Sequence, residues 1–474
     1  MYTKNTKIVC TLGPSSDSFS EITNLIHAGM NVARLNFSHG SYAHHLKIIK
    51  NLRKAEKQLG RRIAILQDLQ GPKIRLGILP EEGIQIKKGE KLTITTEKII
   101  GERNSKEIII PIQYKEIVKD AKAKDVLLIN DGIIEIKIEK VIKNKLFCRA
   151  KTGGLLKSNQ GVNSSTASIS AKPITEKDKK DLEFGLKNNV DYVALSFVRS
   201  PKDIEELRKL ITKHKKDTKI VAKIERHEAV KNLEKIIQIT DAVMVARGDL
   251  GIDIPAAQVP IVQKRMIALA NKYAKPVITA TQVLQSMVEN PIATRAEISD
   301  AANAVFDSTD AIMLSNESAV GKYPFKSTAT LSKVAITVEK EMERHPEILE
   351  NIYARRAFGA LNATCANACE LAKDTSADFI VVYTKSGYTA RHVAKYRPFI
   401  TIITITENES IARELCLTWG LNKIFIHNIK NKGMKKTEEI ISFLKKIKKV
   451  KKGQRIVIVG SASEQEKIIS TYKI

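Results

Sequence analysis

The sequence contains few cysteines and no long apolar run, and each shortage excludes a class of protein. Its five cysteines among 474 residues are scattered and odd in number, which is typical of a reduced cytosolic protein rather than of a disulfide framework or zinc site. Cys365 and Cys369 have the spacing of neighbours on one helix. No apolar stretch reaches about eighteen residues, and the start MYTKNTKIVC lacks the layout of a signal peptide. We therefore expect no membrane span and a cytoplasmic location.

Two common nucleotide-binding signatures are also missing. The chain has no GxxxxGK[ST] loop and no glycine-rich loop of the protein-kinase type. The sequence is therefore neither a P-loop enzyme nor a protein kinase.

Acidic residues are scarce relative to basic ones. The chain has 79 Lys and Arg against 52 Asp and Glu, a formal net charge of +27, which suits either nucleic acid or anionic metabolites as partners. The densest basic stretch, 435–452, also carries apolar residues at helical spacing and predicts an amphipathic helix with a solvated basic face. No zinc-finger spacing, RNA-binding aromatic motif or arginine-rich arm is present. We therefore expect no nucleic-acid partner, and an RNA-binding protein on a former enzyme scaffold remains an alternative.

Short apolar runs alternate with helical patterns along most of the chain. One of these helices is expected to begin at a capping box formed by Ser18 and Glu21 and to end at Gly29. Three predicted strands before residue 74 and five after residue 173 make eight βα units, which predicts an α/β fold of the (β/α)8 TIM-barrel class. An open doubly wound sheet is the alternative at this point. The predicted strands are 7–13, 32–38, 63–69, 192–198, 219–225, 242–247, 276–282 and 311–315.

Two further segments have a different character. Residues from about 74 to 170 alternate with period two around a turn at Asp131-Gly132, which predicts an inserted small β-barrel domain. After residue 345 a new βα series with strands at 379–385, 400–405, 423–428 and 455–460 predicts a separate open α/β domain. The expected domains are 1–70 (barrel, first part), 71–172 (inserted β domain), 173–344 (barrel, second part) and 345–474 (C-terminal α/β domain).

Polar residues that are unusual in buried strands fall at the carboxyl ends of the predicted strands. In a closed barrel these ends meet on one face, where active sites are built. Taken one at a time, these residues are explained as solvated ion pairs or helix caps. The same pattern at the ends of seven strands instead predicts an active site. The residues are Arg34, Asn36 and Ser38 (second strand), Asp68 (third), Ser196 and Arg199 (fourth), Lys223 and Glu225 (fifth), Arg247, Gly248 and Asp249 (sixth), Thr279 and Thr281 (seventh), and Ser315 and Glu317 (eighth).

The types of these residues indicate a magnesium site that handles an anionic substrate. Glu225 and Asp249 offer hard carboxylate oxygens without a His or Cys cluster, which suits Mg²⁺ or Mn²⁺ sharing its shell with substrate and water. The surrounding cations suit a phosphorylated, carboxylated substrate, because phosphoryl transfer relies on positioning and on neutralising charge. These cations are Arg34, Arg75, Lys223 and Arg247.

The motifs taken together resemble the pyruvate kinase family. They are ARLNFSHG (33–40), GPKIR (71–75), KIE (223–225), MVARGDLG (244–251), TATQVLQSM (279–287), ATRAE (293–297) and IMLSNES (312–318). The resemblance follows the whole chain in order, and it implies that the inserted β domain is a lid and that the C-terminal domain is regulatory. It implies a kinase of glycolysis that makes pyruvate and ATP from phosphoenolpyruvate and ADP. A barrel lyase or aldolase acting on a pyruvate enolate is the alternative.

The resemblance assigns roles in the reaction to individual residues. It implies that Arg34 and Lys223 hold the transferring phosphoryl group and that Lys223 also stabilises the enolate. Glu225 and Asp249 would bind Mg²⁺, and Gly248, Asp249 and Thr281 would hold the substrate carboxylate. Proton delivery to the enolate would involve Thr281, Ser315 and Glu317, through water. Nucleotide contacts would come from Asn36, His39, Arg61 and Arg75.

The chain departs from the common family pattern in three places. Ser200 stands where relatives often have a nucleotide-contacting lysine, and Asn316 replaces a glycine. Many relatives also have a glutamate at the position of Lys73 and bind a monovalent cation at positions that correspond to Asn36, Ser38, Asp68 and Leu69. Lys73 resembles the potassium-independent bacterial subgroup, in which a tethered ammonium substitutes for the ion. We therefore expect that K⁺ is not required.

A loop in the C-terminal domain resembles part of a sugar-phosphate effector site. Thr384, Ser386, Gly387 and Thr389 follow a predicted strand and open a helix, where backbone amides could hold a phosphate. An ordinary helix cap explains the same pattern equally well. The final stretch GSASEQEKIIS lacks the glycine- and threonine-rich loop that completes such a site in relatives. Allosteric control by a phosphorylated effector and a homotetrameric assembly are thus implied by the resemblance alone.

Overall fold

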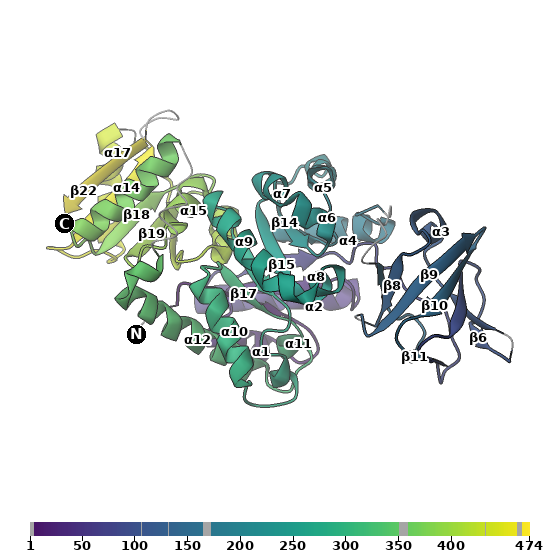
Figure 1. Cartoon of the computed structure of the whole chain (residues 1–474). Helices are drawn as coiled ribbons and strands as arrows, with labels where there is room; N and C mark the ends of the chain where they lie inside the picture. The colour runs from purple at the N-terminus through teal and green to yellow at the C-terminus, as the bar shows by residue number, and fades with distance from the viewer. Residues whose placement is uncertain are drawn as a thin grey trace.

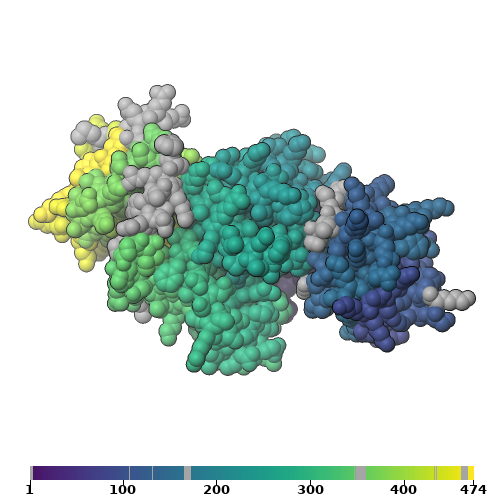
Figure 2. All heavy atoms as spheres, in the orientation of Figure 1, coloured from purple at the N-terminus to yellow at the C-terminus, as the bar shows by residue number. Residues whose placement is uncertain are grey.

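The chain forms three lobes in a row. The computed structural model describes residues 4–105, 107–130, 132–164, 172–349, 359–431, 433–461 and 467–474. A barrel lies in the middle, the C-terminal domain adjoins one end of it, and a β-rich domain adjoins the other (Figure 1). The same row is visible when all atoms are drawn, with the blue β domain on the opposite side of the teal barrel from the yellow C-terminus (Figure 2).

The central lobe is a closed parallel barrel with the strand order β1-β17-β16-β15-β14-β13-β3-β2. Its strands are short apolar runs with few exposed side chains, as expected of strands that helices cover on the outside. The predicted TIM barrel is therefore confirmed, and the open doubly wound sheet is excluded. The strands are β1 (Lys7–Thr11), β2 (Val32–Asn36), β3 (Ala64–Asp68), β13 (Tyr192–Leu195), β14 (Lys219–Ile224), β15 (Ala242–Ala246), β16 (Val277–Ala280) and β17 (Ala311–Leu314).

Helices alternate with the barrel strands, and the first begins and ends where the sequence predicts. Ser18 Oγ accepts the N–H of Glu21 at the start of α1 (Phe19–Ala28), and Gly29 ends this helix in a left-handed conformation. The Glu21 carboxylate accepts from Asn24 Nδ2. The other helices of this lobe are α2 (Tyr42–Leu59), α4 (Glu176–Lys187), α5 (Pro201–Lys213), α6 (His227–Lys231), α7 (Leu233–Ile239), α8 (Arg247–Asp253), α9 (Val259–Lys272), α10 (Arg295–Phe306), α11 (Asn316–Ala319) and α12 (Pro324–Arg344).

The β domain is inserted between β3 and α4 and has a core of its own. Its main sheet has the order β12-β8-β9-β10-β5-β7-β6, beside a small sheet of β11 and β4. β8 and β9 pair antiparallel as predicted, although Asp131 of the predicted turn lies outside the described residues. The elements are β4 (Ile84–Ile86), β5 (Lys91–Thr95), β6 (Glu102–Arg103), β7 (Ile108–Pro111), α3 (Ile117–Asp120), β8 (Val126–Ile129), β9 (Ile134–Ile142), β10 (Lys145–Ala150), β11 (Gly154–Leu156) and β12 (Val162–Ser164).

The C-terminal domain is a sheet with the order β20-β19-β18-β21-β22. Its last strand is antiparallel and was not predicted from the sequence. Cys365 and Cys369 lie buried on one helix, as their spacing predicts, and the basic amphipathic helix is present as α17. The elements are α14 (Ala360–Asp374), β18 (Phe379–Tyr383), α15 (Tyr388–Ala394), β19 (Thr401–Thr406), α16 (Glu409–Glu414), β20 (Lys423–Ile426), α17 (Gly433–Lys446), β21 (Arg455–Ser461) and β22 (Lys467–Lys473).

A buried ion pair joins the C-terminal domain to the amino-end face of the barrel. Arg397 Nη1 lies 3.1 Å from Asp310 Oδ1, and the N–H of Trp419 donates to the same oxygen. Asp310 immediately precedes β17, so the contact is at the start of a barrel strand. The opposite face, formed by the carboxyl ends of the strands, therefore faces away from the C-terminal domain. Among the described residues, no helix is both long enough and apolar enough to cross a membrane.

Candidate active site

Four charged side chains meet at the carboxyl ends of β2, β3 and β14. Lys223 Nζ lies 3.2 Å from Asp68 Oδ1 and 2.9 Å from Glu225 Oε1. Arg34 Nε donates to Asp68 Oδ2 over 2.7 Å. The Asp68 and Glu225 side chains are each only 1% exposed. The structure thus brings together residues that are far apart in the sequence, at the face where the strand-end pattern placed them.

The electrostatics of this cluster keep its cation charged. Burial acts to lower the pKa of Lys223, but the carboxylates of Asp68 and Glu225 outweigh it and raise the pKa above the ordinary value. Burial acts to raise the pKa of Asp68, but Lys223 and Arg34 outweigh it and lower the pKa. Burial, aided by nearby Asp249, raises the pKa of Glu225. Lys223 is therefore a fixed ammonium, not a base poised to accept a proton.

Polar groups around the cluster hold its members in place. Lys223 Nζ donates to Ser196 Oγ over 2.7 Å, and Ser196 Oγ donates in turn to the carbonyl of Leu69. The N–H of Phe197 donates to Glu225 Oε2, and Arg34 Nη1 donates to Thr11 Oγ1. Sequence reasoning noted Ser196 without giving it a role and missed Thr11. Thr11 ends β1, so the same strand-end pattern, extended to the first strand, identifies it.

A second polar group lies where β15 and β16 end. The N–H of Gly248 donates to Thr281 Oγ1 over 2.9 Å, which joins two of the predicted carboxylate-binding residues. β16 ends at Ala280, earlier than predicted, because Thr281 and Gln282 leave the strand with φ of 67° and 52°. These positive values are uncommon for residues other than glycine and are found at functional sites.

Arg247 does not face the substrate region, contrary to the sequence interpretation. Its guanidinium donates to both carboxylate oxygens of Asp300 and to the carbonyls of Ala280 and Thr281. A guanidinium with these partners has no donor left over for a phosphoryl group in the same orientation. Arg247 therefore holds the turn after β16, and its donors are taken up by protein acceptors.

Glu317 likewise connects two loops. Its Oε1 accepts the N–H of Leu284, and its Oε2 accepts the N–H of Ser315. The side chain is fully buried. Both oxygens are thus occupied by backbone amides, and the carboxylate fixes Ser315 and the segment after Thr281 relative to each other.

The predicted nucleotide-binding residues divide into two groups. Asn36 ends β2 and His39 follows it, so both lie at the carboxyl-end face, and Arg75 lies on the segment that leads into the β domain. Arg75 Nη1 donates to the carbonyl of Asn159. Arg61 precedes β3 (Ala64–Asp68), which places it at the amino-end face, at the opposite end of that strand from Asp68. The structure therefore does not bring Arg61 together with the others.

Lys73 extends toward the β domain in this structure. Its side chain is exposed, its Cε lies 3.6 Å from the position that a Cβ would occupy at Gly161, and it joins no ion pair among the described residues. In the proposed monovalent-cation region, Asn36 Oδ1 accepts the N–H of Ser38, and the Leu69 carbonyl accepts from Ser196 Oγ. Asp68 is already neutralised by Lys223 and Arg34.

Glu225 and Asp249 fit the requirements of a magnesium ion. Glu225 Oε1 is buried and is paired with the ammonium of Lys223, 2.9 Å away. Asp249 is half-buried at the start of α8 and is close enough to Glu225 to raise the pKa of that carboxyl. Carboxylate oxygens, each with more than one lone pair, are the donors that Mg²⁺ prefers.

The remaining predicted positions have local structural roles in the chain. Ser200 caps α5 together with Asp203, and Asn316 is the first residue of α11. In the C-terminal loop, Thr384 is buried, and Arg391 Nη2 donates to the carbonyl of Ser386. Gly387 adopts φ of 75° immediately before α15, and Thr389 lies within that helix.

Known proteins resemble this chain over nearly its whole length. Residues 3–328 match the family model "Pyruvate kinase, barrel domain", and residues 362–474 match "Pyruvate kinase, alpha/beta domain". Pyruvate kinase 2 of Synechocystis sp. is 44% identical over 89% of this chain and 71% of its own length, and the pyruvate kinase of Bacillus licheniformis is 41% identical over 88% and 71%. A crystal structure of a pyruvate kinase from Cryptosporidium parvum matches with a TM-score of 0.91 and 32% identity, over 99% of this chain and 96% of that one.

These matches agree with the residues that the barrel brings together and leave no support for a lyase or an RNA-binding scaffold. The chain belongs to the pyruvate kinase family, whose members are phosphotransferases that transfer the phosphoryl group of phosphoenolpyruvate to ADP in glycolysis.

Proposed function

We propose that Lys223 and Arg34 are the groups that hold the phosphoryl group during this transfer. The observation that carries the proposal is the position of Lys223 Nζ between the carboxylates of Asp68 and Glu225, with Ser196 Oγ as a third partner. A preorganised cation of this kind stabilises charge where it develops, without reorganising during the reaction. Lys223 also lies where it can neutralise the enolate oxygen that remains after the phosphoryl group has left.

Magnesium, or manganese in its place, would be held by Glu225 and Asp249. When bound, the ion neutralises phosphoryl oxygens and polarises the oxygen of the substrate that becomes the enolate. Lys223, which is paired with Glu225, would share that carboxylate with the ion and direct its ammonium at the same substrate oxygens. Arg34 stays oriented through Asp68 and Thr11.

The substrate carboxylate would be bound by Gly248, Asp249 and Thr281. The backbone amides at the start of α8 supply the donors, and Thr281 Oγ1 is oriented by the N–H of Gly248. Delivery of a proton to the enolate carbon is assigned to water held by Thr281 and Ser315, with Glu317 fixing the loop that carries Ser315. This proposal changes the sequence-based interpretation, in which Glu317 shared in delivering the proton.

The nucleotide would contact Asn36, His39 and Arg75. Arg75 belongs to the segment that connects the barrel to the β domain, and it already binds the carbonyl of Asn159 in that domain. We propose that the β domain closes over the site and carries Arg75 toward the nucleotide phosphates. Exclusion of water by a lid protects a phosphoryl group from hydrolysis.

Independence from K⁺ is a further part of the proposal. Lys73 is two residues from the Gly71 turn, is exposed, and has a long flexible side chain that can reach the region of Asp68 when the β domain closes. One ammonium about 4 Å from an anionic group at an effective dielectric near 20 contributes about 4 kcal/mol before desolvation. A tethered cation of this strength replaces a bound monovalent ion. The sequence motif GPK, typical of the potassium-independent subgroup, supports this assignment.

Three other features are retained as proposals. A cytoplasmic location is consistent with the five thiols, all of which are free and buried. A homotetramer and control by a phosphorylated effector at Thr384, Ser386, Gly387 and Thr389 follow from the family resemblance. The Arg391 side chain now contacts this loop and would have to move, or take part, when a phosphate binds.

The experiment that tests the proposal measures pyruvate formation from phosphoenolpyruvate, ADP and Mg²⁺ in tetramethylammonium buffer, with and without KCl. Full activity without KCl is the expected result. Activity only with KCl would support the proposed reaction and contradict the proposed role of Lys73 as a substitute for the ion. Absence of activity in both buffers would contradict the assignment of the catalytic groups.

A further inference from the structure

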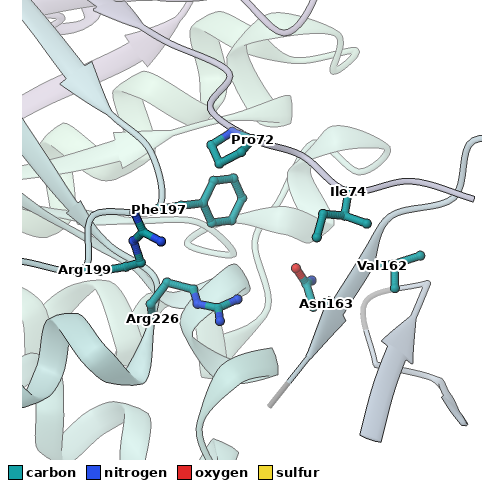
Figure 3. Close-up of a pocket in the computed structure, with 7 residues that line it drawn as sticks. All are labelled: Pro72, Ile74, Val162, Asn163, Phe197, Arg199 and Arg226. Carbon is teal, nitrogen blue, oxygen red and sulfur yellow. The ribbon is translucent and has the colours of Figure 1, made fainter. Parts of the chain in front are cut away.

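A small cavity lies between the barrel and the β domain, outside the catalytic cluster. Figure 3 shows it between Phe197, which follows β13, Arg226, which precedes α6, and Asn163 of β12. The space in which a water-sized sphere can be centred is about 30 Å³. Because one ordered water needs roughly 10–15 Å³ by this measure, the cavity holds two or three waters or one small oxyanion. None of the residues assigned to the reaction is among the described residues that line it.

Arg226 is a buried cation that lines this cavity and has one unused donor. The residue is only 6% exposed, and its Nη2 has no hydrogen-bond partner among the described residues. Its Nε and Nη1 lie 3.5 Å from Glu228 Oε2 and Asp253 Oδ1, which is longer than the 2.7–2.9 Å of a strong charge-assisted bond. In Figure 3 the guanidinium extends from the barrel toward Asn163. A buried donor without an acceptor costs free energy, so this geometry indicates that a bound ligand supplies the acceptor.

The carboxylates beside Arg226 also contact His227. Asp253 Oδ2 accepts from both the backbone N–H and the ring Nδ1 of His227. Glu228 Oε2 lies 3.2 Å from the same ring nitrogen. Arg226 is therefore one of several donors to this pair of carboxylates, and its second terminal nitrogen is left without a partner among the described residues.

A second guanidinium reaches the same cavity from a different element. Arg199 lines it, and its Nη2 lies 3.7 Å from Asp203 Oδ1. Asn163, which lines the cavity from the β domain, brings a side-chain amide that can donate to an oxyanion. The rest of the lining is apolar and comes from Pro72, Ile74, Val162 and Phe197.

We propose that Arg226 and Arg199 form a second anion site, which binds a phosphate or carboxylate group at the base of the β domain. Guanidinium groups bind both kinds of oxyanion through paired N–H donors, and the apolar walls lower the competition from water. Because Asn163 belongs to the β domain and the arginines belong to the barrel, a bound anion ties the two lobes together. Anion binding therefore changes the turnover number through the position of the lid, without competing for the catalytic centre.

Inorganic phosphate is the probe for the test, with acetate as a second arm. Phosphate binding to the full chain is measured by titration calorimetry, and kcat is measured against phosphate at saturating phosphoenolpyruvate and ADP, where competition at the catalytic centre is overcome. Arg226→Gln is expected to weaken phosphate binding about tenfold or more, since it removes charge-assisted hydrogen bonds, and to abolish the change in kcat. Arg149→Gln, which removes one positive charge from an exposed ion pair with Glu139, serves as the matched control and should behave as the wild type.

Two outcomes would overturn the proposal. One is equal phosphate affinity in wild type and Arg226→Gln, and the other is a phosphate effect that vanishes as phosphoenolpyruvate is raised. Should Arg226→Gln lose its far-UV circular dichroism signal, Arg199→Gln provides the same comparison. Binding of acetate that is lost in the same variant would identify the site as one for carboxylates as well as phosphates, and binding of phosphate alone would restrict it to tetrahedral oxyanions.

Discussion

Arg247 and Asp300 form a bidentate ion pair next to the turn that follows β16, with Nη1 2.8 and 2.7 Å from the two carboxylate oxygens. The same guanidinium donates to the carbonyl of Thr281, 2.7 Å from Nη2. Thr281 and Gln282 have positive φ, a conformation that the surrounding structure must impose. Arg247 thus acts as a positioning residue for Thr281, which is proposed to bind the substrate carboxylate.

Arg247→Lys is expected to lower kcat by about ten- to a hundred-fold, with little change in KM for ADP. A lysine keeps the charge but cannot bind Asp300 and the main-chain carbonyls at the same time, so Thr281 shifts, and small misplacements of this kind are costly in catalysis. Steady-state kinetics in both substrates give the measurement. Arg208→Lys, which alters a single ion pair with Asp241, is the control. A wild-type kcat in Arg247→Lys would show that the turn after β16 keeps its conformation without the arginine.

Lys223→Gln is expected to lower kcat by about a hundred- to a thousand-fold, which is the effect of removing one preorganised group from a developing oxyanion. The variant keeps an uncharged N–H donor on a side chain one atom shorter than lysine, but it loses the ammonium that is proposed to face the phosphoryl and enolate oxygens. Lys219→Gln is the matched control because Lys219 lies at the other end of the same strand and pairs with exposed Asp217. Comparable losses in the two variants would contradict a catalytic role for Lys223.

The sequence predicts the barrel and the meeting of Asp68, Lys223 and Glu225 because both follow from short-range rules. Apolar runs of strand length separated by helical patterns define βα units, and the closure of eight units places the carboxyl ends of the strands on one face. Ser196 and Thr11 lie at such ends and are identified by the same rule. The antiparallel strand β22 was missed because an edge strand of mixed polarity has no clear period of its own.

The direction in which long side chains extend could not be predicted from the sequence. Arg247 follows a barrel strand as the pattern requires, yet its guanidinium turns away to Asp300. Lys73 follows Gly71 as the family motif requires, yet its side chain extends toward Gly161. Arginine and lysine have several rotatable bonds, so their partners are decided by tertiary contacts. The predicted grouping of Arg61 with the other nucleotide-binding residues differs from the structure for another reason: Arg61 lies at the amino end of a correctly predicted strand.

Lys73→Glu is expected to make activity depend on K⁺. The substitution removes the mobile ammonium and adds a carboxylate near Asp68 and the substrate, so a bound monovalent cation becomes necessary to offset the negative charge. Activity without KCl should fall at least about tenfold and should recover when KCl is added. Lys157→Glu makes the same charge change at an exposed position of the β domain and should leave the KCl response unaltered. Equal activity of Lys73→Glu with and without KCl would contradict the proposal that Lys73 substitutes for a bound cation.

Glu414 is expected to make the protein less stable as the pH rises from about 4 to 7. The residue is buried, its Oε2 accepts no hydrogen bond from the described residues, and burial raises the pKa of its carboxyl to about 7, despite nearby Lys219 and Arg391. In the unfolded chain the pKa of glutamate is about 4.3, so in this interval the unfolded form releases a proton that the folded form still holds. The free energy of unfolding therefore falls with each pH unit in this interval, and the loss reaches about 3 kcal/mol near pH 7.

Glu414→Gln removes this titration while keeping the shape of the protonated acid. The gain in unfolding free energy over the wild type should be small near pH 4.5 and should grow to about 3 kcal/mol by pH 8, measured by urea unfolding across that range. Glu409→Gln, at the exposed start of the same helix, loses an ion pair with Arg62 and should show no gain that increases with pH. A stability difference that stays constant with pH would mean that Glu414 is ionised in the folded protein at all these pH values, with Lys219 and Arg391 supplying enough charge to hold it so.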